Sequence, residues 1–410
     1  MTRLKVLLSA FACRPNEGSE LGLGWNMIRE IARHHELWVL TQDRHRPFIE
    51  EEVSRRPMPG VRFVYYRLPG AVGWWRRGQR GIQTYYYLWQ IGAYRLMRAL
   101  QERVGFDVTH HVTFAGYWKP SLLSLLPVPF VWGPVGGGED APRSFRTSFG
   151  VRGLVYEDTR DVMRFVGEHD PLVRITARKS RVAFAATEET ASRLEALGAR
   201  DVRLLSQVAL SGEEIEMLRG LGVKREAPFR FASSGRLLHW KGFHLGLAAF
   251  ARADIPGSEY LIFGDGPHRK RLQRLAVDLG LAERVRFMGG MPREKALRML
   301  GSCQVFVHPS LHESGGWVCA EAMAIGLPLL CLDIGGPARH VVSGLNGYKV
   351  AAGSPKQVVD DLAEAMRLLW SKPEVLQSMS LRARRRVGED YDWRDKGEYI
   401  AGVYREVVGR

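Results

Sequence analysis

Short apolar runs alternate with amphipathic segments along most of the chain, and this alternation limits the folds that the chain can adopt. One series starts with the segments KVLLSAFA, WNMIREIARHH and ELWVLTQD. A second series starts at FRFASSGRL and continues through EYLIFGDG, VRFMGG, CQVFVHPS and PLLCLD. Such alternation is typical of parallel strands joined by crossover helices. The sequence therefore predicts an α/β protein with two doubly wound, Rossmann-like sheets.

The length of the chain agrees with two domains, because 410 residues exceed what one hydrophobic core usually supports. The polar stretch VRLLSQVALSGEEIEMLRGLGVKREAP separates the two series. We therefore expect an N-terminal domain of residues 1–205 and a C-terminal domain of residues 206–390, which face a cleft. We expect residues 391–410 to form a helix that packs back on the first domain.

Basic residues outnumber acidic residues by 59 to 44, which gives a net charge of +15. The excess is greatest in residues 53–103, where arginines alternate with aromatic residues in GWWRRGQRGIQTYYYLWQ. Such a segment suits the headgroup zone of an anionic membrane. We expect a cytoplasmic protein with peripheral contact to the anionic inner leaflet of the inner membrane. The alternative is that these aromatic residues form core beneath a solvated basic rim.

Glycines and cations cluster where strands of the second series end. Gly235 and Arg236 follow one apolar run, and Lys241 lies just before the amphipathic segment FHLGLAAFARA. Glycine lets the backbone approach a ligand, and two cations near a helix start suit a diphosphate. Gly264 ends the next run, and Met291 follows VRFMGG, where a flat nucleotide base could lie.

Two glutamates lie eight positions apart in LHESGGWVCAEAMAIG. Glu313 follows the apolar run CQVFVHPSL, and Gly315 and Gly316 then permit a tight turn into a helix that carries Glu321. Eight helical residues of about 100° each leave the two side chains about 80° apart, so that both can face one site. Since its neighbours are apolar, Glu321 needs a partner to offset the cost of burial.

These motifs together resemble the family-4 retaining glycosyltransferases (glycosyltransferase group 1) of the GT-B fold. The resemblance rests on Gly235-Arg236, Lys241-Gly242, the Glu313-x7-Glu321 motif, Gly335-Gly336 and Asn346-Gly347. The N-terminal stretch ACRPNEGSELGLGWNMIREIARHHELWVLT also resembles a branch of this family found in bacterial surface-polysaccharide pathways.

The resemblance implies that residues 1–205 form the acceptor-side domain and residues 206–390 the nucleotide-sugar donor-binding domain. It also implies a role for each matching residue. Arg236 and Lys241 would hold the donor diphosphate, and Glu321 would bind the ribose. Glu313, with the backbone from Ser314 through Gly315 to Gly316, would orient the donor sugar. Gly18 and Ser19 match a glycine-rich loop near the phosphates. No metal and no further cofactor would be needed.

The sequence departs from the family pattern in the first half. The family often shows Asp-x-x-His-x-His, whereas FDVTHHVTF keeps Asp107 and His110 but has Val112 in the last place. The histidine expected near the transferred sugar is therefore His110 or His111, and we favour His110. A structural histidine is the alternative for either position.

Together these features predict a retaining glycosyltransferase that uses a UDP- or GDP-linked sugar and a saccharide or lipid-linked saccharide acceptor. Its pathway would be bacterial exopolysaccharide, lipopolysaccharide or related glycan synthesis. One alternative is a sugar-nucleotide epimerase or hydrolase on the same fold. A nucleic-acid-binding protein is a second alternative, but the sequence shows no recognised motif for it, so we expect no nucleic-acid partner.

Overall fold

The computed structural model describes residues 2–70, 81–222 and 228–409. Trp74, Trp75, Arg76, Arg77 and Arg80, which support the membrane prediction, lie outside these ranges. The chain forms two compact units. The first comprises Met1–Gly138, Arg160–Gln207 and Trp393–Arg410, and the second comprises Glu139–Thr159 and Val208–Asp392.

The first unit contains a seven-stranded parallel sheet in the order β3-β2-β1-β4-β5-β6-β7. The strands are β1 (Lys5–Ala10), β2 (Glu36–Gln42), β3 (Val61–Tyr66), β4 (Val108–Thr113), β5 (Phe130–Val135), β6 (Ser180–Ala185) and β7 (Val202–Leu204). All six residues of β4 are buried, as expected for a central strand with helices on both faces. The strand order reverses between β1 and β4, which is where ligands of doubly wound sheets bind.

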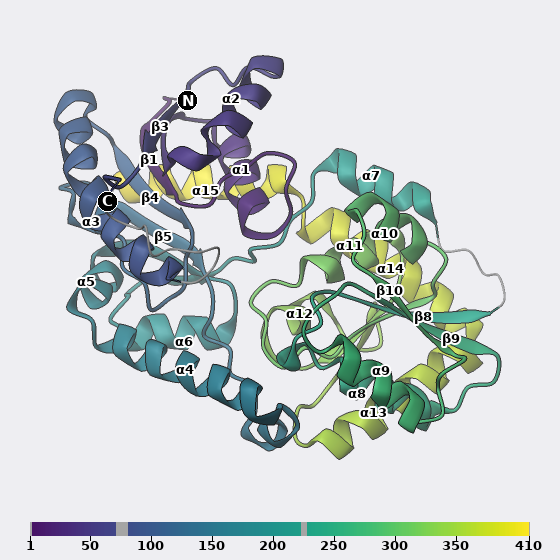
Figure 1. Cartoon of the computed structure of the whole chain (residues 1–410). Coiled ribbons are helices and arrows are strands. Elements are labelled where there is room, and N and C mark those ends of the chain that lie inside the picture. The colour runs from purple at the N-terminus through teal and green to yellow at the C-terminus, as the bar shows by residue number, and fades with distance from the viewer. Residues whose placement is uncertain (1, 71–80, 223–227, 410) are drawn as a thin grey trace. The chain divides into compact units, whose positions relative to one another are not determined.

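Helices connect these strands as crossover elements (Figure 1). They are α1 (Ser19–Ile31), α2 (Arg46–Arg55), α3 (Ile82–Val104), the second half of α4 (Gly150–His169), α5 (Pro171–Lys179) and α6 (Glu188–Ala196), with short 3-10 turns η1 (Asp43–His45) and η2 (Leu122–Leu125). The 3-10 turn η3 (Arg143–Ser148) and the first half of α4 belong to the second unit, and α15 (Trp393–Val408) ends the first unit. The C-terminal helix α15 packs against α1, and the backbone carbonyl of Ala401 lies 3.3 Å from Nε2 of His35.

The second unit contains a six-stranded parallel sheet in the order β10-β9-β8-β11-β12-β13. The strands are β8 (Phe229–Ser234), β9 (Ser258–Phe263), β10 (Val285–Gly289), β11 (Val305–His308), β12 (Leu329–Leu332) and β13 (Gly347–Val350). The helices are α7 (Gly212–Leu221), α8 (Phe243–Ala253), α9 (Arg269–Asp278), α10 (Arg293–Leu300), α11 (Trp317–Ile325), α12 (Gly335–His340), α13 (Pro355–Ser371) and α14 (Pro373–Asp390), and η4 (His239–Lys241) precedes α8.

Successive strand residues supply the two apolar layers of this second sheet. Phe231 and Ile262 pack with α8, α9 and α13, whereas Ala232 and Leu261 pack with α7, α10, α11 and α14 (Figure 1). The period of two residues along a strand explains this division. Because both faces are covered, the carboxyl ends of the strands form the exposed edge at which polar ligands can bind.

The division of the chain differs from the expected domain boundaries in one segment. We placed all of residues 1–205 in the first domain, but residues 139–159 belong to the second unit. Phe145 and Phe149 of this segment are buried in the same apolar cluster as Phe243 and Phe250 of α8. The boundary between the units therefore falls within α4.

Candidate functional site

The predicted binding residues of the second half lie at the carboxyl edge of the second sheet. Gly235 follows β8, Gly264 follows β9, and Met291 follows β10, where it packs partly buried against the apolar cluster of α11. Glu313 lies five residues beyond the end of β11. Since β8 and β11 flank the point where the strand order reverses, these residues surround the usual ligand position of such a sheet.

Glu313 forms a short ion pair with Lys241. The Nζ of Lys241 donates a hydrogen bond to Oε2 of Glu313 at 2.6 Å, and Nε2 of His308 lies 2.7 Å from the same oxygen. Burial alone would raise the pKa of Glu313, but Lys241 and His308 outweigh it and hold the pKa well below its usual range. Glu313 is therefore an ionised carboxylate with a fixed position.

A close approach of two loops places Lys241 beside Glu313. Gly242, directly after Lys241, has φ +66°, and a Cβ at this position would lie 1.8 Å from the carbonyl oxygen of Pro309. Only glycine permits this contact between the turn before α8 and the loop after β11. Arg236, by contrast, is exposed, and its side chain has no ion pair within the described part of the chain.

The turn between Glu313 and α11 is held by its neighbours. Ser314 donates a hydrogen bond to Oε2 of Glu139 at 2.7 Å, and the amide of Gly336 donates to the carbonyl of Glu313 at 2.7 Å. A Cβ at Gly336 would lie 2.3 Å from the carbonyl oxygen of Ser314. Gly315 follows Ser314, and Gly316 then adopts φ +86° to start α11. The paired glycines of α12 thus allow this turn to pack closely.

Glu321 belongs to a separate ion-pair network. Its side chain is buried on α11, and Nε of Arg293 donates to its Oε1 at 2.6 Å. Arg293 also donates to Glu214 at 3.1 Å. Burial raises the pKa of Glu321, although Arg293 opposes this effect. The apolar neighbours of Glu321 predict a partner for it, but no local pattern identifies Arg293, which lies 28 positions earlier at the start of α10.

Gly264 lets the loops after β8 and β9 approach each other. It has φ +117°, and a Cβ here would lie 2.0 Å from the carbonyl oxygen of Gly235. We expect Gly264→Ala to lower the melting temperature and to weaken nucleotide binding. Gly280→Ala is the matched control, because Gly280 also has positive φ (+71°) but no atom within 4 Å of the added carbon. Left-handed strain alone costs about 1–2 kcal/mol in the control, and Gly264→Ala adds the steric clash and the greater strain of φ +117°.

Thermal unfolding of the two glycine variants compares a site with backbone strain alone, Gly280, with a site that also has a steric clash, Gly264. A much larger fall in melting temperature for Gly264→Ala than for Gly280→Ala is expected. Equal falls would contradict the importance of the contact between the two loops.

Gly18 and Ser19 lie in the first unit, at the turn from β1 into α1. Ser19 adopts φ +57°, which is uncommon for a residue other than glycine, asparagine or aspartate. The next residue, Glu20, accepts a hydrogen bond from the amide of Phe114 at 2.5 Å. This contact ties the turn to the chain just beyond β4.

His110 is a buried residue of β4 rather than an open ligand contact. Its Nδ1 lies 2.5 Å from the hydroxyl of Tyr404 on α15, and its Nε2 lies 2.6 Å from the carbonyl oxygen of Gly133. Burial lowers its pKa to about 4. Because both ring nitrogens contact protein groups, the geometry favours the structural alternative over the predicted sugar contact. His111 is also buried, and its Nε2 lies 3.3 Å from the hydroxyl of Tyr86.

The described residues show neither a metal-binding cluster nor a helix that could span a membrane. In residues 2–70, 81–222 and 228–409, no group of three or more histidine, cysteine, aspartate or glutamate side chains is arranged to hold a metal ion. Within the same ranges, no helix has the length and apolarity required to cross a membrane.

Comparison with known proteins identifies the second half of the chain. Residues 216–386 match the family described as Glycosyl transferases group 1. The lipopolysaccharide core biosynthesis glycosyltransferase LpsE of Rhizobium meliloti (strain 1021) is 36% identical over 199 residues, which cover 46% of this chain and 57% of LpsE. The matched parts span about half the length of the curated relatives.

Solved structures match almost the whole chain. A sucrose-phosphate synthase from Thermosynechococcus elongatus superimposes with a TM-score of 0.68 at 17% identity, covering 99% of this chain and 100% of that protein. The Anabaena protein HepE in complex with UDP gives a TM-score of 0.64 at 16% identity, covering 98% of this chain and 100% of HepE. At these identities the likeness shows the fold, which is the two-domain GT-B fold predicted from the sequence.

Proposed function

We propose that this chain, which carries a glycosyl transferases group 1 domain over residues 216–386, is a retaining glycosyltransferase. It would move a sugar from a nucleoside-diphosphate donor to a saccharide or lipid-linked saccharide acceptor. The pathway would be bacterial exopolysaccharide, lipopolysaccharide or related glycan synthesis, and the relative LpsE is named for lipopolysaccharide core biosynthesis. The observation that carries this proposal is the Glu313–Lys241 ion pair at the carboxyl edge of the second sheet, where Arg236 follows β8.

Charge stabilisation is the main task of this site. As the bond to the donor sugar breaks, negative charge develops on the departing diphosphate. Arg236 and Lys241 supply positive charge there, and such preorganised groups are usually the largest contribution to catalysis. In this proposal the departing phosphate oxygen takes the proton of the acceptor hydroxyl, and the new bond forms on the face from which the phosphate leaves.

The two glutamates have different tasks in this proposal. Glu313 is ionised and fixed by Lys241 and His308, so that it can accept hydrogen bonds from hydroxyls of the donor sugar. Glu321 uses Oε1 for Arg293, while its Oε2 has no hydrogen bond within the residues that the structure describes. That oxygen is suited to a ribose hydroxyl.

Calorimetric titration with UDP, GDP and other nucleoside diphosphates tests the donor assignment. UDP is the first choice, because HepE was solved in complex with it. We expect one nucleoside diphosphate to bind in a saturable manner. Isomerised donor, or free nucleotide and sugar released at full rate without an acceptor, would instead support the epimerase or hydrolase alternative.

Transfer is expected to continue in EDTA. The resemblance to metal-independent enzymes predicts this result, since Arg236 and Lys241 can neutralise the diphosphate. The measurement is the initial rate after dialysis against EDTA, compared with the rate after Mg²⁺ or Mn²⁺ is restored. A strict dependence on added metal would contradict the proposed role of the two cations.

A further inference from the structure

The second half of α4 has its polarity inverted relative to an ordinary surface helix. Arg160 and Arg164 are buried, with 8% and 4% of their surfaces exposed, whereas Val162, Phe165 and Val166 are 62%, 62% and 61% exposed. An amphipathic helix normally turns its apolar face to the core. Contiguous exposed apolar side chains usually mark a surface that contacts a partner or ligand.

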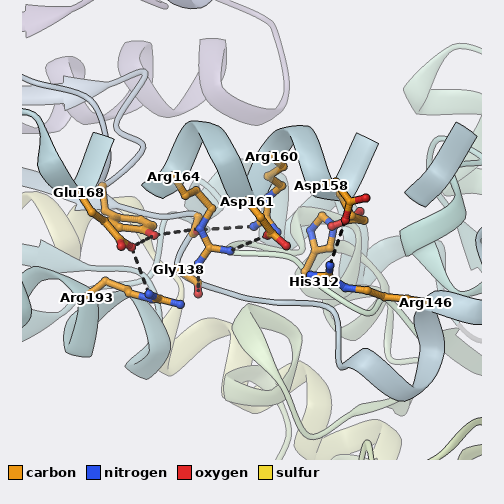
Figure 2. A network of polar contacts seen from close by, with 12 residues as sticks. Gly138, Arg146, Asp158, Arg160, Asp161, Arg164, Glu168, Arg193 and His312 are labelled. Atoms are coloured by element: carbon orange, nitrogen blue, oxygen red, sulfur yellow. Dashed lines mark hydrogen bonds and ion pairs between the residues drawn. The ribbon is translucent and has the colours of Figure 1, made fainter. Parts of the chain in front are cut away.

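A polar network fixes this orientation of α4. Arg164 donates from Nη2 to the carbonyl of Gly138 at 2.9 Å and from Nε to the hydroxyl of Tyr117 at 2.9 Å. Tyr117 in turn donates to Glu168, which also forms an ion pair with Arg193 at 3.1 Å (Figure 2). Rotating the helix to bury its valines would leave these charged groups unpaired, at a large cost.

An apolar hollow lies between this face of α4 and the start of α3. Its volume is about 440 Å³, within the range of small-molecule sites. Its lining includes Tyr87, Trp118, Pro120, Met163 and Val166. The acidic residue at its border, Asp170, is already used, because its carboxylate caps α5 by accepting from the amide of Leu172 at 2.8 Å.

Lys119 is the one cationic residue among the described residues that line the hollow. Its Nζ lies 3.5 Å from the centroid of the Phe114 ring, and the side chain makes no hydrogen bond or ion pair within the described part of the chain. Burial lowers its pKa to about 8, against the opposing influence of Glu20. A half-buried ammonium group without an anionic partner is costly, and a bound anion would remove this cost.

We propose that this hollow binds an amphiphile with a phosphate headgroup, whose apolar chain lies against Met163 and Val166 and whose phosphate contacts Lys119. If the proposed function holds, this ligand is the lipid part of a lipid-linked acceptor. Contact with an apolar chain removes the exposed valines and Met163 from water, which favours binding. The phosphate supplies the missing partner of Lys119.

Titration of the full chain with dodecyl phosphate below its micellar concentration tests the proposal, with Trp118 in the hollow as a fluorescent reporter. We expect saturable binding, weakened about tenfold or more by Val166→Glu, because a carboxylate then opposes both chain and phosphate. Val277→Glu is the matched control. Val277 on α9 is 63% exposed, close to the 61% of Val166, and its replacement should leave binding unchanged.

Lys119→Gln separates the headgroup contact from the chain contact. This variant should weaken dodecyl phosphate by about tenfold, the value of one charge-assisted contact, while the affinity for dodecanol stays the same. Equal weakening of both ligands would overturn the assignment of Lys119 to the phosphate. Absence of saturable binding in the unmodified chain would overturn the proposal as a whole.

Two further measurements exclude other occupants. The chain could float with vesicles of phosphatidylglycerol without binding monomeric dodecyl phosphate. This result would show that the surface contacts a bilayer, and it would overturn the proposal that the hollow binds a single amphiphile. The chain could instead form a dimer that Val166→Glu dissociates, again without amphiphile binding. This result would show that a second copy of the chain covers this face, and it would also overturn the proposed amphiphile site. UDP calorimetry on the same preparations reports separately on the proposed function.

Discussion

Replacing Lys241 with alanine is expected to lower the rate of glycosyl transfer by about two to three orders of magnitude, as when one preorganised charge contact is lost from a transition state. The variant loses a cation beside the departing diphosphate. It also leaves the Glu313 carboxylate with His308 as its one remaining side-chain partner among the described residues, so that the pKa of this partly buried carboxyl rises. The measurement is kcat/KM together with the melting temperature.

Two further variants test whether the loss of activity in Lys241→Ala comes from its position at the proposed diphosphate site. Lys349→Ala is the control, because Lys349 also pairs with an acid in the second unit, Asp333 at 2.8 Å, yet has no proposed role in transfer. Arg236→Ala should match Lys241→Ala in lost activity but not in stability, since Arg236 is exposed and has no ion pair in the described ranges. Normal turnover in both Lys241→Ala and Arg236→Ala would show that the diphosphate lies elsewhere.

Glu321→Gln and Glu313→Gln are expected to cause different losses. Glu321→Gln should weaken UDP binding by about tenfold or more, because a hydrogen bond to a charged group contributes about 1.5–3 kcal/mol. It also leaves Arg293 without the carboxylate that it contacts at 2.6 Å. Glu313→Gln should leave UDP affinity unchanged and lower kcat, since Glu313 is assigned to the transferred sugar.

Calorimetry with UDP and steady-state kinetics measure the two losses side by side. Glu364→Gln on α13 is a suitable control for the charge change, because Glu364 is exposed and has no role in the site. Equal weakening of UDP by the Glu321 and Glu313 variants would contradict the separate tasks of the two glutamates.

The sequence was sufficient to predict the elements that depend on local patterns. Alternating apolar runs predicted both parallel sheets, and the position of Glu313 beyond the run CQVFVHPSL matches its place after β11. The glycines were expected to let the backbone approach a ligand, whereas the structure places Gly242 and Gly264 where two loops meet with no room for a side chain. The pairing of Glu313 with His308 is also local, because the two residues are five positions apart at the end of one strand and in the loop that follows it.

Contacts between distant parts of the chain could not be predicted in this way. Arg293 and Glu321 come from different helices, and Ser314 contacts Glu139, which lies 175 positions earlier. A single sequence gives the periodicity of a segment but not the surface against which it packs, so residues 139–159 were placed in the wrong half. The same limit applies to His110, whose contact with Tyr404 spans 294 positions.

The most direct test of the central claim is the anomeric configuration of the transferred sugar. The chain should be incubated with the nucleotide sugar whose nucleoside diphosphate binds in calorimetry, together with a panel of saccharide and lipid-linked acceptors. Proton NMR of the product then gives the configuration of the new glycosidic bond. We predict a product with the same configuration as the donor, formed in step with release of the nucleoside diphosphate. An inverted product, or no transfer from any nucleotide sugar that binds, would contradict the account.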